Sequence, residues 1–337
     1  MDRARNHLWR DRVDHAVKRT LSNVLDATVV GGFSRVGYEF RSRASSFDRP
    51  EELDLRGRRI VVTGPTSGLG RETARMLATA GADLVLAGRD RPRTEAAARE
   101  VDALGVGSVE TVLADMGDLD AVASASRTIA GSGRLDALVH NAGALLKQRE
   151  VSPQGFEVTV ASHVLGPFLM TRLLVDALTE SSGRVVTVSS GGMYAVPLPR
   201  VAGARTLEMG EHNWDGTKQY AIAKRAQVTL NEMWAVERSG VWFAAMHPGW
   251  ADTPGVKSSL PFFRVVTKPL LRTARQGADT IAWLAGVDEP GAGSGAFWCD
   301  REVRSIHKTG GTRASDTPDR RRDLWRWCTA CTDPFVA

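Results

Sequence analysis

The stretch RRIVVTGPTSGLG, residues 58–70, decides the fold of this 337-residue chain. Residues 58–63 form an apolar run of strand length, and three glycines and a proline follow it. Residues 71–80 carry apolar side chains at helical spacing and end at Gly81, a residue type that favours the position just after a helix. A strand, a glycine turn and a helix in this order predict a dinucleotide site, because the turn admits a pyrophosphate and the helix N-terminus stabilises its charge.

Five further apolar runs of strand length repeat the pattern, and helix-like segments separate them. Continuous apolar runs indicate strands covered on both faces, so we predict a single doubly wound (Rossmann) α/β domain with a parallel sheet. Ligands of such sheets bind beyond the carboxyl ends of the strands. The runs span residues 83–87, 109–114, 135–140, 183–189 and 241–247, and they are followed by Gly88, Asp115, Asn141, Ser190 and Pro248.

The end of the second run indicates which dinucleotide binds. NAD-specific sites usually place a carboxylate here for the ribose hydroxyls, but this chain has Gly88 followed by Arg89. A guanidinium suits a 2′-phosphate, so we predict NADP (NADPH) in preference to NAD. Arg71, in the first turn after the glycines, adds to the same positive field. The alternative for both arginines is a solvated surface position.

A tyrosine and a lysine supply the candidate chemistry. Tyr220 and Lys224 are four residues apart in a predicted amphipathic helix, residues 219–234, so both side chains lie on one helical face. A nearby positive charge favours the phenolate and lowers the phenol pKa toward neutral pH, where the group transfers protons more readily. Among the three tyrosines of the chain, only Tyr220 has a lysine at this spacing.

The order of these motifs resembles the short-chain dehydrogenase/reductase family, over residues 56 to 300. Longer strings at residues 188–193, 246–256 and 276–280 are similar to one subgroup of that family, and this likeness implies no particular substrate. The motifs that carry the resemblance are TGxxxGxG at 63–70, NAG at 141–143, Ser190, YxxxK at 220–224 and PG at 248–249.

The resemblance implies a role for each matching residue. Tyr220 would exchange a proton with the substrate oxygen, and Lys224 would lower the pKa of Tyr220 and bind the nicotinamide ribose. Ser190 would hydrogen-bond the substrate oxygen, with Ser189 as the competitor for that role. Asp115 would lie at the adenine and Thr253 at the carboxamide. With Arg89, the full set of cofactor contacts is Gly64, Thr66, Ser67, Gly68, Leu69, Gly70, Asp115, Met116, Asn141, Ala142, Gly143, Tyr220, Lys224, Pro248, Gly249 and Thr253.

Two features depart from the family pattern. The fourth catalytic position, an asparagine in the family, is His163 here, counted back from LGPF at residues 165–168. An imidazole can hold a water as an amide can, but its charge depends on pH, and the alternative is a structural histidine. The interval from Ser190 to Tyr220 is longer than usual and predicts an inserted loop around residues 197–216.

The segment between Thr253 and Gln276 is strongly apolar and predicts a cover over the substrate; a dimer contact or a core helix is the alternative. Such a cover favours a small lipophilic carbonyl/alcohol pair. The resemblance therefore implies an NAD(P)-dependent short-chain dehydrogenase/reductase. The alternatives are a dehydratase or epimerase that uses the same Tyr220–Lys224 pair, and a non-catalytic NADP(H)-binding sensor or scaffold.

Extensions flank the predicted domain. We predict an amphipathic helical extension at residues 1–55, the Rossmann-fold domain at 56–310 and a tail with a helix at 311–337. Residues 1–49 hold ten Lys/Arg and six Asp/Glu, so their net charge of +4 supplies most of the chain's +5, and we predict no nucleic-acid partner. Apolar residues at helical spacing between Leu8 and Val29 predict packing on the enzyme or a partner subunit; a membrane-surface helix is the alternative.

Composition sets the remaining expectations. A hydrophobic content of 42% and a charged content of 25% are typical of soluble globular proteins, and we expect no spanning segment and no signal peptide. The chain has three cysteines, and the CxxC at residues 328–331 lacks a second half-site, so we expect no metal site. This cysteine usage fits a reducing compartment, and we expect a cytoplasmic homo-oligomer.

Overall fold

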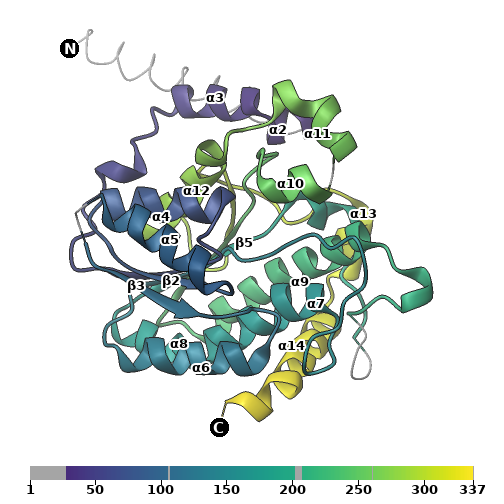
Figure 1. Ribbon diagram of the computed structural model, residues 1–337. Coiled ribbons are helices and arrows are strands. Elements are labelled where there is room, and N and C mark those ends of the chain that lie inside the picture. Colours follow the sequence, from purple (N-terminus) through teal and green to yellow (C-terminus); the bar gives the residue numbers. More distant parts are fainter. Residues whose placement is uncertain (1–27, 105–106, 202–206, 260, 337) are drawn as a thin grey trace, which may run out of the picture.

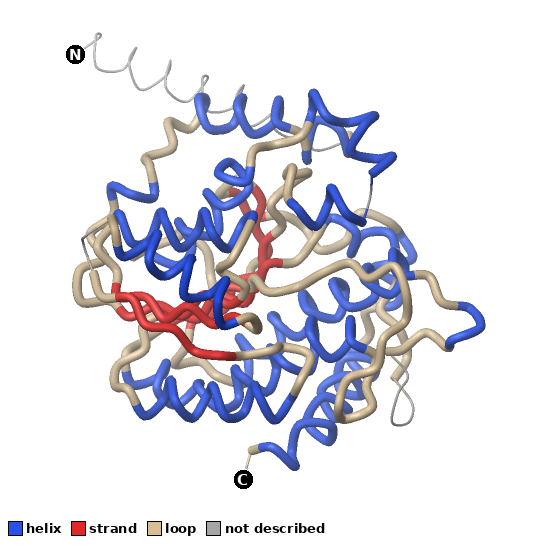
Figure 2. The backbone as a smooth tube through the Cα atoms, in the orientation of Figure 1, coloured by secondary structure: helices blue, strands red, loops and turns tan. Residues whose placement is uncertain are grey.

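The computed structural model describes residues 28–104, 107–201, 207–259 and 261–336. The predicted amphipathic segment from Leu8 to Val29 lies almost wholly outside these residues, as does the middle of the predicted loop at residues 197–216. Figures 1 and 2 show a central sheet with helices on both of its faces.

One sheet organises the described chain. Its strand order is β3-β2-β1-β4-β5-β6-β7-β8, and every neighbouring pair is parallel except β7 with β8. This order confirms the predicted doubly wound fold. The last two strands were not predicted, because strands this short leave no periodic signal. The strands are β1 (Arg59–Thr63), β2 (Asp83–Gly88), β3 (Val109–Leu113), β4 (Ala137–His140), β5 (Arg184–Val188), β6 (Trp242–Met246), β7 (Phe297–Cys299) and β8 (Glu302–Val303).

Both faces of the sheet are buried, which explains the uninterrupted apolar runs. In β1, Ile60 and Val62 pack into one core, whereas Val61 packs into the other. The first core lies under α4 (Gly68–Thr79), α5 (Arg91–Asp102) and α12 (Ala274–Gly286). The second lies under α6 (Leu119–Gly131), α8 (Gly166–Glu180) and α9 (Gly216–Glu237), on the opposite side of the sheet in Figure 1.

Shorter elements complete the described chain. They are α2 (Val29–Phe33), α3 (Arg35–Ala44), η1 (Pro50–Glu52), α7 (Val158–Val160), the π-turn η2 (Ala161–Leu165), η3 (Gly191–Ala195), η4 (Glu211–Asn213), α10 (Pro254–Ser259), α11 (Pro261–Thr267), η5 (Lys268–Leu270), α13 (Gly310–Ser315), α14 (Pro318–Thr332) and η6 (Asp333–Phe335). In Figure 1, α2, α3 and α11 lie above the α4–α12 layer, α10 lies to the right of α12, and α14 lies on the opposite side of the sheet.

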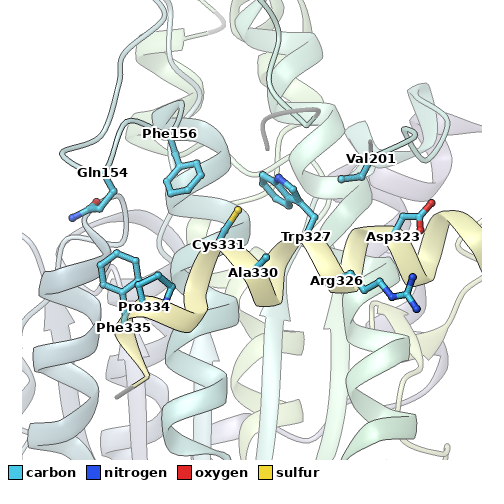
Figure 3. A pocket seen from close by; sticks show the side chains of 10 residues that line it. All are labelled: Gln154, Phe156, Val201, Asp323, Arg326, Trp327, Ala330, Cys331, Pro334 and Phe335. Atoms are coloured by element: carbon cyan, nitrogen blue, oxygen red, sulfur yellow. The ribbon is translucent and has the colours of Figure 1, made fainter. Parts of the chain in front are cut away.

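Helix α14 packs on the body of the domain. The ring centroid of Trp325 is 5.1 Å from that of Phe168 on α8 and 4.7 Å from that of Trp234 on α9. Leu198, in the insertion after β5, belongs to the same core. Its backbone N–H also donates to the Ser315 hydroxyl at 2.9 Å. A groove of about 710 Å³ runs beside α14, with Trp327 in its wall (Figure 3). None of the predicted site residues lines this groove.

The run Val158–Glu180 is the one stretch of the described chain long and apolar enough to cross a membrane. Within it, 78% of the most apolar window is buried inside the fold, as is usual for a core helix.

Candidate active site

The glycine turn after β1 has a shape that other residues fit poorly. Gly64 and Gly68 have φ angles of +66° and +55°. A Cβ on Gly70 would overlap the Gly64 carbonyl oxygen. The Asn141 side chain donates from Nδ2 to the carbonyl oxygens of Thr63 at 2.9 Å and Gly64 at 3.1 Å. The end of β4 therefore holds the turn in place.

Helix α4 begins at Gly68, earlier than predicted, because residues 68–70 form its first turn. Among the described residues, Ser67 at the N-cap makes no side-chain hydrogen bond to the helix. The first backbone N–H groups of a helix have no acceptor within it. Open donors beside glycines that permit close approach suit a pyrophosphate, so the residues present here fit a dinucleotide cofactor.

The end of β2 disfavours a side chain at position 88, where NAD-specific sites usually carry a carboxylate. A Cβ on Gly88 would overlap the hydroxyl of Thr94, which donates to the Asp90 carbonyl oxygen at 2.7 Å. Arg89 is exposed at this edge, whereas the Arg71 guanidinium forms a 2.6 Å ion pair with Glu100. Within the described chain, Arg89 is therefore the better placed of the two predicted arginines to meet a phosphate.

Tyr220 and Lys224 lie on one face of α9. The Lys224 ammonium is 5.3 Å from the centre of the Tyr220 ring and donates to the Val188 carbonyl oxygen at 2.8 Å. Lys224 is 3% exposed, and burial lowers its pKa to about 7. Burial also raises the pKa of Tyr220, and the hydrogen bond with Ser190 opposes that rise.

The predicted net lowering of the Tyr220 pKa is therefore wrong for the protein alone. Desolvation disfavours the charged forms of both groups, since it raises the pKa of Tyr220 and lowers that of Lys224. Attraction between the two groups acts only when Lys224 carries its proton and Tyr220 has lost its own. An anion beside Lys224 would favour its ammonium form, whereas a hydrogen-bond donor to the Tyr220 oxygen would favour the phenolate.

The two serines after β5 have different partners. Ser189 is buried, and its hydroxyl donates to the Lys224 carbonyl oxygen at 3.1 Å. The Ser190 hydroxyl hydrogen-bonds Tyr220 and also accepts from the Gly192 backbone N–H at 3.2 Å. Ser190 is therefore the serine at the phenol, and Ser189 attaches the end of β5 to α9.

His163 lies on the π-turn η2 and faces the phenol. Its ring centroid is 5.3 Å from that of Tyr220, at an interplanar angle of 88°. Its Nε2 lies 2.9 Å from the Ala144 carbonyl oxygen, and the ring covers Gly143, where a Cβ would overlap it. The Nδ1 atom is buried and has no hydrogen-bond partner among the described residues. π-Turns within helices are frequent at functional sites.

Burial lowers the pKa of His163 to about 3, and Lys224 adds to that lowering. The imidazole is therefore neutral across the physiological range. The pH-dependent charge expected from a histidine at this position is absent, because desolvation removes it.

The predicted adenine contacts follow β3, beside β2. Asp115 is exposed, and its Oδ1 accepts from the Gly117 backbone N–H at 2.9 Å. Met116 is buried. The Ala142 backbone N–H, after β4, donates to the Thr63 hydroxyl at 3.0 Å and ties this edge to the glycine turn.

The segment after β6 reaches the same turn. A Cβ on Gly68 would lie 3.4 Å from the Cβ of Thr253. Gly249, after Pro248, has a φ angle of +70°, and a Cβ there would overlap the Arg272 guanidinium. The structure thus brings the strand ends after β1, β4, β5 and β6 together with α9 at one edge of the sheet.

Two residues at this edge were not predicted from the sequence. Gln227 donates from Nε2 to the His163 carbonyl oxygen at 2.7 Å and so supports the π-turn. Its position three residues after Lys224, on the same helical face, is a signal that could have found it. Phe33 packs behind Ser190, and no local pattern could have found it, because its partners are far away in the chain.

Comparison with known proteins agrees with this geometry. The family model described as short chain dehydrogenase matches residues 58–202. Dehydrogenase/reductase SDR family member 12 of Homo sapiens is 34% identical over 295 residues, which cover 86% of this chain and 91% of that protein. The chain belongs to the short-chain dehydrogenase/reductase family. This relative also represents the subgroup predicted from the longer strings, which confirms that prediction.

Two more comparisons extend the result. Retinol dehydrogenase 11 of Mus musculus is 30% identical over 279 residues, covering 81% of this chain and 87% of that protein. A crystal structure described as a putative NAD(P)-dependent gluconate 5-dehydrogenase from Beutenbergia cavernae, with NADP bound at low occupancy, is similar with a TM-score of 0.57. It is 27% identical and the match covers 69% of this chain and 91% of that one. The chain is thus an NAD(P)-dependent oxidoreductase of this family.

Proposed function

We propose that this protein interconverts a small lipophilic carbonyl compound and its alcohol with NADP(H), and that Tyr220 is its general acid and base. The observation that carries the proposal is the cluster of Tyr220, Lys224 and Ser190 at the carboxyl edge of the sheet, beside the glycine turn. When bound, the nicotinamide supplies or accepts the hydride.

Tyr220 donates its phenolic proton to the substrate oxygen in reduction and takes it back in oxidation. Ser190 donates a hydrogen bond to the same oxygen, while its own oxygen accepts from the Gly192 N–H. Lys224 stabilises the phenolate and binds the ribose hydroxyls, and its pKa of about 7 lets it take up or release a proton near neutral pH. These roles account for a buried lysine without a carboxylate partner among the described residues.

His163 takes the place of the family asparagine in this proposal. Its buried Nδ1 has no hydrogen-bond partner among the described residues and is suited to hold a water, and its neutral ring does so without adding charge. Such a water would connect Lys224 to solvent. His163 therefore acts through proton supply, not through contact with the substrate.

NADP is the proposed cofactor because a Cβ at position 88 would overlap the Thr94 hydroxyl, which disfavours a carboxylate there, and Arg89 is exposed beside it. The pyrophosphate would lie on the residue 64–70 turn and the α4 N-terminus, the adenine at Asp115 and Met116, and the carboxamide at Thr253. Ala142, Gly143, Pro248 and Gly249 would line the space between them.

The lipophilic substrate class is proposed from the apolar segment after Thr253 and from a relative named for retinol, a lipophilic alcohol. In that segment, Val265 and Val266 on α11 are 72% and 63% exposed. Exposed apolar side chains beside the site suit a cover that closes on an apolar ligand. Homo-oligomerisation and a cytoplasmic location stay predictions.

The test is NADPH oxidation against a panel of aldehydes, ketones and quinones. Tyr220→Phe should lower turnover by roughly 10²–10⁴-fold, the usual contribution of general acid–base catalysis, with little change in NADPH affinity. Tyr38→Phe, a change of the same kind in α3, is the matched control and should leave turnover unchanged. A Tyr220→Phe protein with wild-type turnover would refute the mechanism.

The same screen separates the alternatives. Turnover without net NADPH consumption would indicate a dehydratase or epimerase, and tight NADPH binding with no turnover of any panel member would indicate a sensor. Net consumption of NADPH supports the proposal.

A further inference from the structure

The N-terminal extension reaches the proposed catalytic serine through Phe33, the last residue of α2. The ring is 6% exposed. A Cβ on Gly191, the residue directly after Ser190, would lie 2.7 Å from Phe33 Cε2. Only a glycine at 191 lets the aromatic edge lie this close to the backbone of the turn. The Phe33 ring therefore forms the back wall of the turn that presents Ser190.

The same ring also contacts the segment after β6. Its centroid is 4.2 Å from that of His247, edge to face, and 6.2 Å from that of Trp250. The Trp250 backbone N–H donates to the Phe33 carbonyl oxygen at 2.8 Å. Tyr194, at the other end of the Ser190 turn, stacks with Phe33 at 6.3 Å. The ring is thus wedged between the ends of β5 and β6.

A buried ionic cluster holds Phe33 in this place. Arg41 of α3 and Arg272, which precedes α12, both bind the Asp300 carboxylate, at 2.8 Å and 2.5 Å, and each of the three side chains is 1% exposed. Both guanidiniums also donate to the Gly32 carbonyl oxygen, at 2.7 Å from Arg41 and 3.2 Å from Arg272. The backbone next to Phe33 is therefore held by two charges, one from the neighbouring helix α3 and one from a distant part of the chain.

The position of the Ser190 hydroxyl depends on this wall. Ser190 begins the 3-10 turn η3, and its Oγ is oriented by the N–H of Gly192 within that turn. A shift of the turn moves the hydroxyl relative to the phenol of Tyr220, and positioning errors of about 1 Å are enough to slow catalysis strongly.

We propose that Phe33, carried by the N-terminal extension, is a positioning residue that holds Ser190 in register with Tyr220. The inference rests on the proposed function of Ser190. With this role of Phe33, the extension contributes to the active site as well as to packing.

The test compares Phe33→Leu with a matched control in the same extension. Phe47→Leu removes another aromatic ring, which contacts Arg301 of the body at 4.6 Å and Tyr38 of α3 at 6.3 Å. In full-length protein, Phe33→Leu should lower kcat by about 10–100-fold, with less effect on the KM for NADPH. Phe47→Leu should leave kcat unchanged. Phe33→Met is made in parallel, so that the result does not depend on one variant folding.

A double-mutant cycle with Ser190→Ala shows whether Phe33 acts through the serine. In the Ser190→Ala background, Phe33→Leu should change kcat by no more than about two-fold. A full additional loss in that background would overturn the inference, because it would mean that Phe33 supports folding or another group. Loss of activity in Ser190→Ala with none in Phe33→Leu and Phe33→Met would also overturn it, while leaving the proposed function intact.

A second measurement does not require turnover. The chain has three tyrosines, so phenolate absorbance across alkaline pH, compared in each background with the same protein carrying Tyr220→Phe, isolates the titration of Tyr220. Lys224 and His163, the titratable groups that face the phenol among the described residues, stay in every variant. Phe33→Leu should raise the pKa of Tyr220 as Ser190→Ala does, because the hydrogen bond from Ser190 is weakened. An unshifted Tyr220 in Phe33→Leu, with a shifted one in Ser190→Ala, would refute the inference; no shift in Ser190→Ala would refute the proposed Ser190–Tyr220 contact itself.

Discussion

Two sites in this protein bury charged side chains, and they differ in whether a partner of opposite charge compensates the burial. Arg41, Arg272 and Asp300 come from three distant segments, and the carboxylate is bound by both guanidiniums. Burial alone would raise the pKa of Asp300, but the two arginines outweigh it and hold that pKa below its usual value. Lys224 is nearly as buried, yet its ammonium meets one carbonyl oxygen and a neutral phenol.

The difference indicates a separate role for each of the two sites. Where charge is matched and hydrogen-bonded, the group stays charged and holds the structure together. Where a buried charge is left unmatched, its pKa moves toward neutrality and the group becomes able to exchange protons. The contrast predicts that removing one buried charge has opposite effects on stability at the two places.

The largest expected effect is at the matched cluster. Asp300→Asn leaves two buried guanidiniums without an anion and should lower the free energy of unfolding by about 3–5 kcal/mol. Asp288→Asn, which breaks the exposed pair with Arg58, is the control and should cost under about 1 kcal/mol. Denaturant unfolding measures both, and equal losses would remove the distinction between the clusters.

The pH dependence of this contribution has a definite sign. Because the folded-state pKa of Asp300 lies below the unfolded value, its stabilisation is fully present above about pH 4 and is lost as pH falls through the folded pKa. The difference between wild type and Asp300→Asn should therefore shrink in acid and be constant from pH 5 to 8.

At Lys224, removal of the buried charge should change the free energy of unfolding in the opposite direction. Lys224→Met removes a desolvated ammonium and should raise the free energy of unfolding of the protein alone by about 1–4 kcal/mol, while activity and NADPH binding are lost. The folded-state pKa of about 7 lies below the unfolded value, so the penalty is fully present below pH 7 and fades as pH rises above it. The gain should therefore be larger at pH 6 than at pH 9. Lys218→Met, at an exposed position of the same helix, should leave stability unchanged at both pH values.

A smaller effect is expected at the edge of the cofactor site. Arg89→Asp should cut the preference for NADPH over NADH by about ten-fold or more, since it removes a phosphate partner and adds a repelling charge. Arg99→Asp, at an exposed position on α5, is the control for the change in net charge. Fluorescence titration with both cofactors measures the ratio, and equal affinities in the wild type would rule out the NADP assignment.

The smallest change is expected at His163. Since burial holds its pKa near 3, His163→Asn should keep activity and leave the pH–rate profile between pH 5 and 9 unchanged. His163→Leu, which cannot hold a water, should slow turnover without unfolding the protein. If the leucine variant is as active as wild type, the histidine only fills space against Gly143.

Much of this site could be predicted from the sequence, because its signals are local. The β1–glycine turn–α4 unit and the Tyr220–Lys224 pair each depend on spacing within one strand, turn or helix. The resemblance favours Ser190 over Ser189, and the hydrogen bonds place Ser190 at the phenol and Ser189 against the backbone of Lys224. The boundaries of β7 and β8, by contrast, had no periodicity to reveal them.

The sequence by itself determined the family, the doubly wound sheet and the candidates for the reacting groups, since apolar periodicity and motif spacing can be read along the chain. Only the tertiary structure decided the protonation of those groups, because desolvation depends on everything packed around Lys224 and His163. It alone joined Arg41 to Asp300 and placed Phe33 behind Ser190. Contacts between residues hundreds of positions apart carry no local signature, and they form only when the sheet brings its strand ends to one edge.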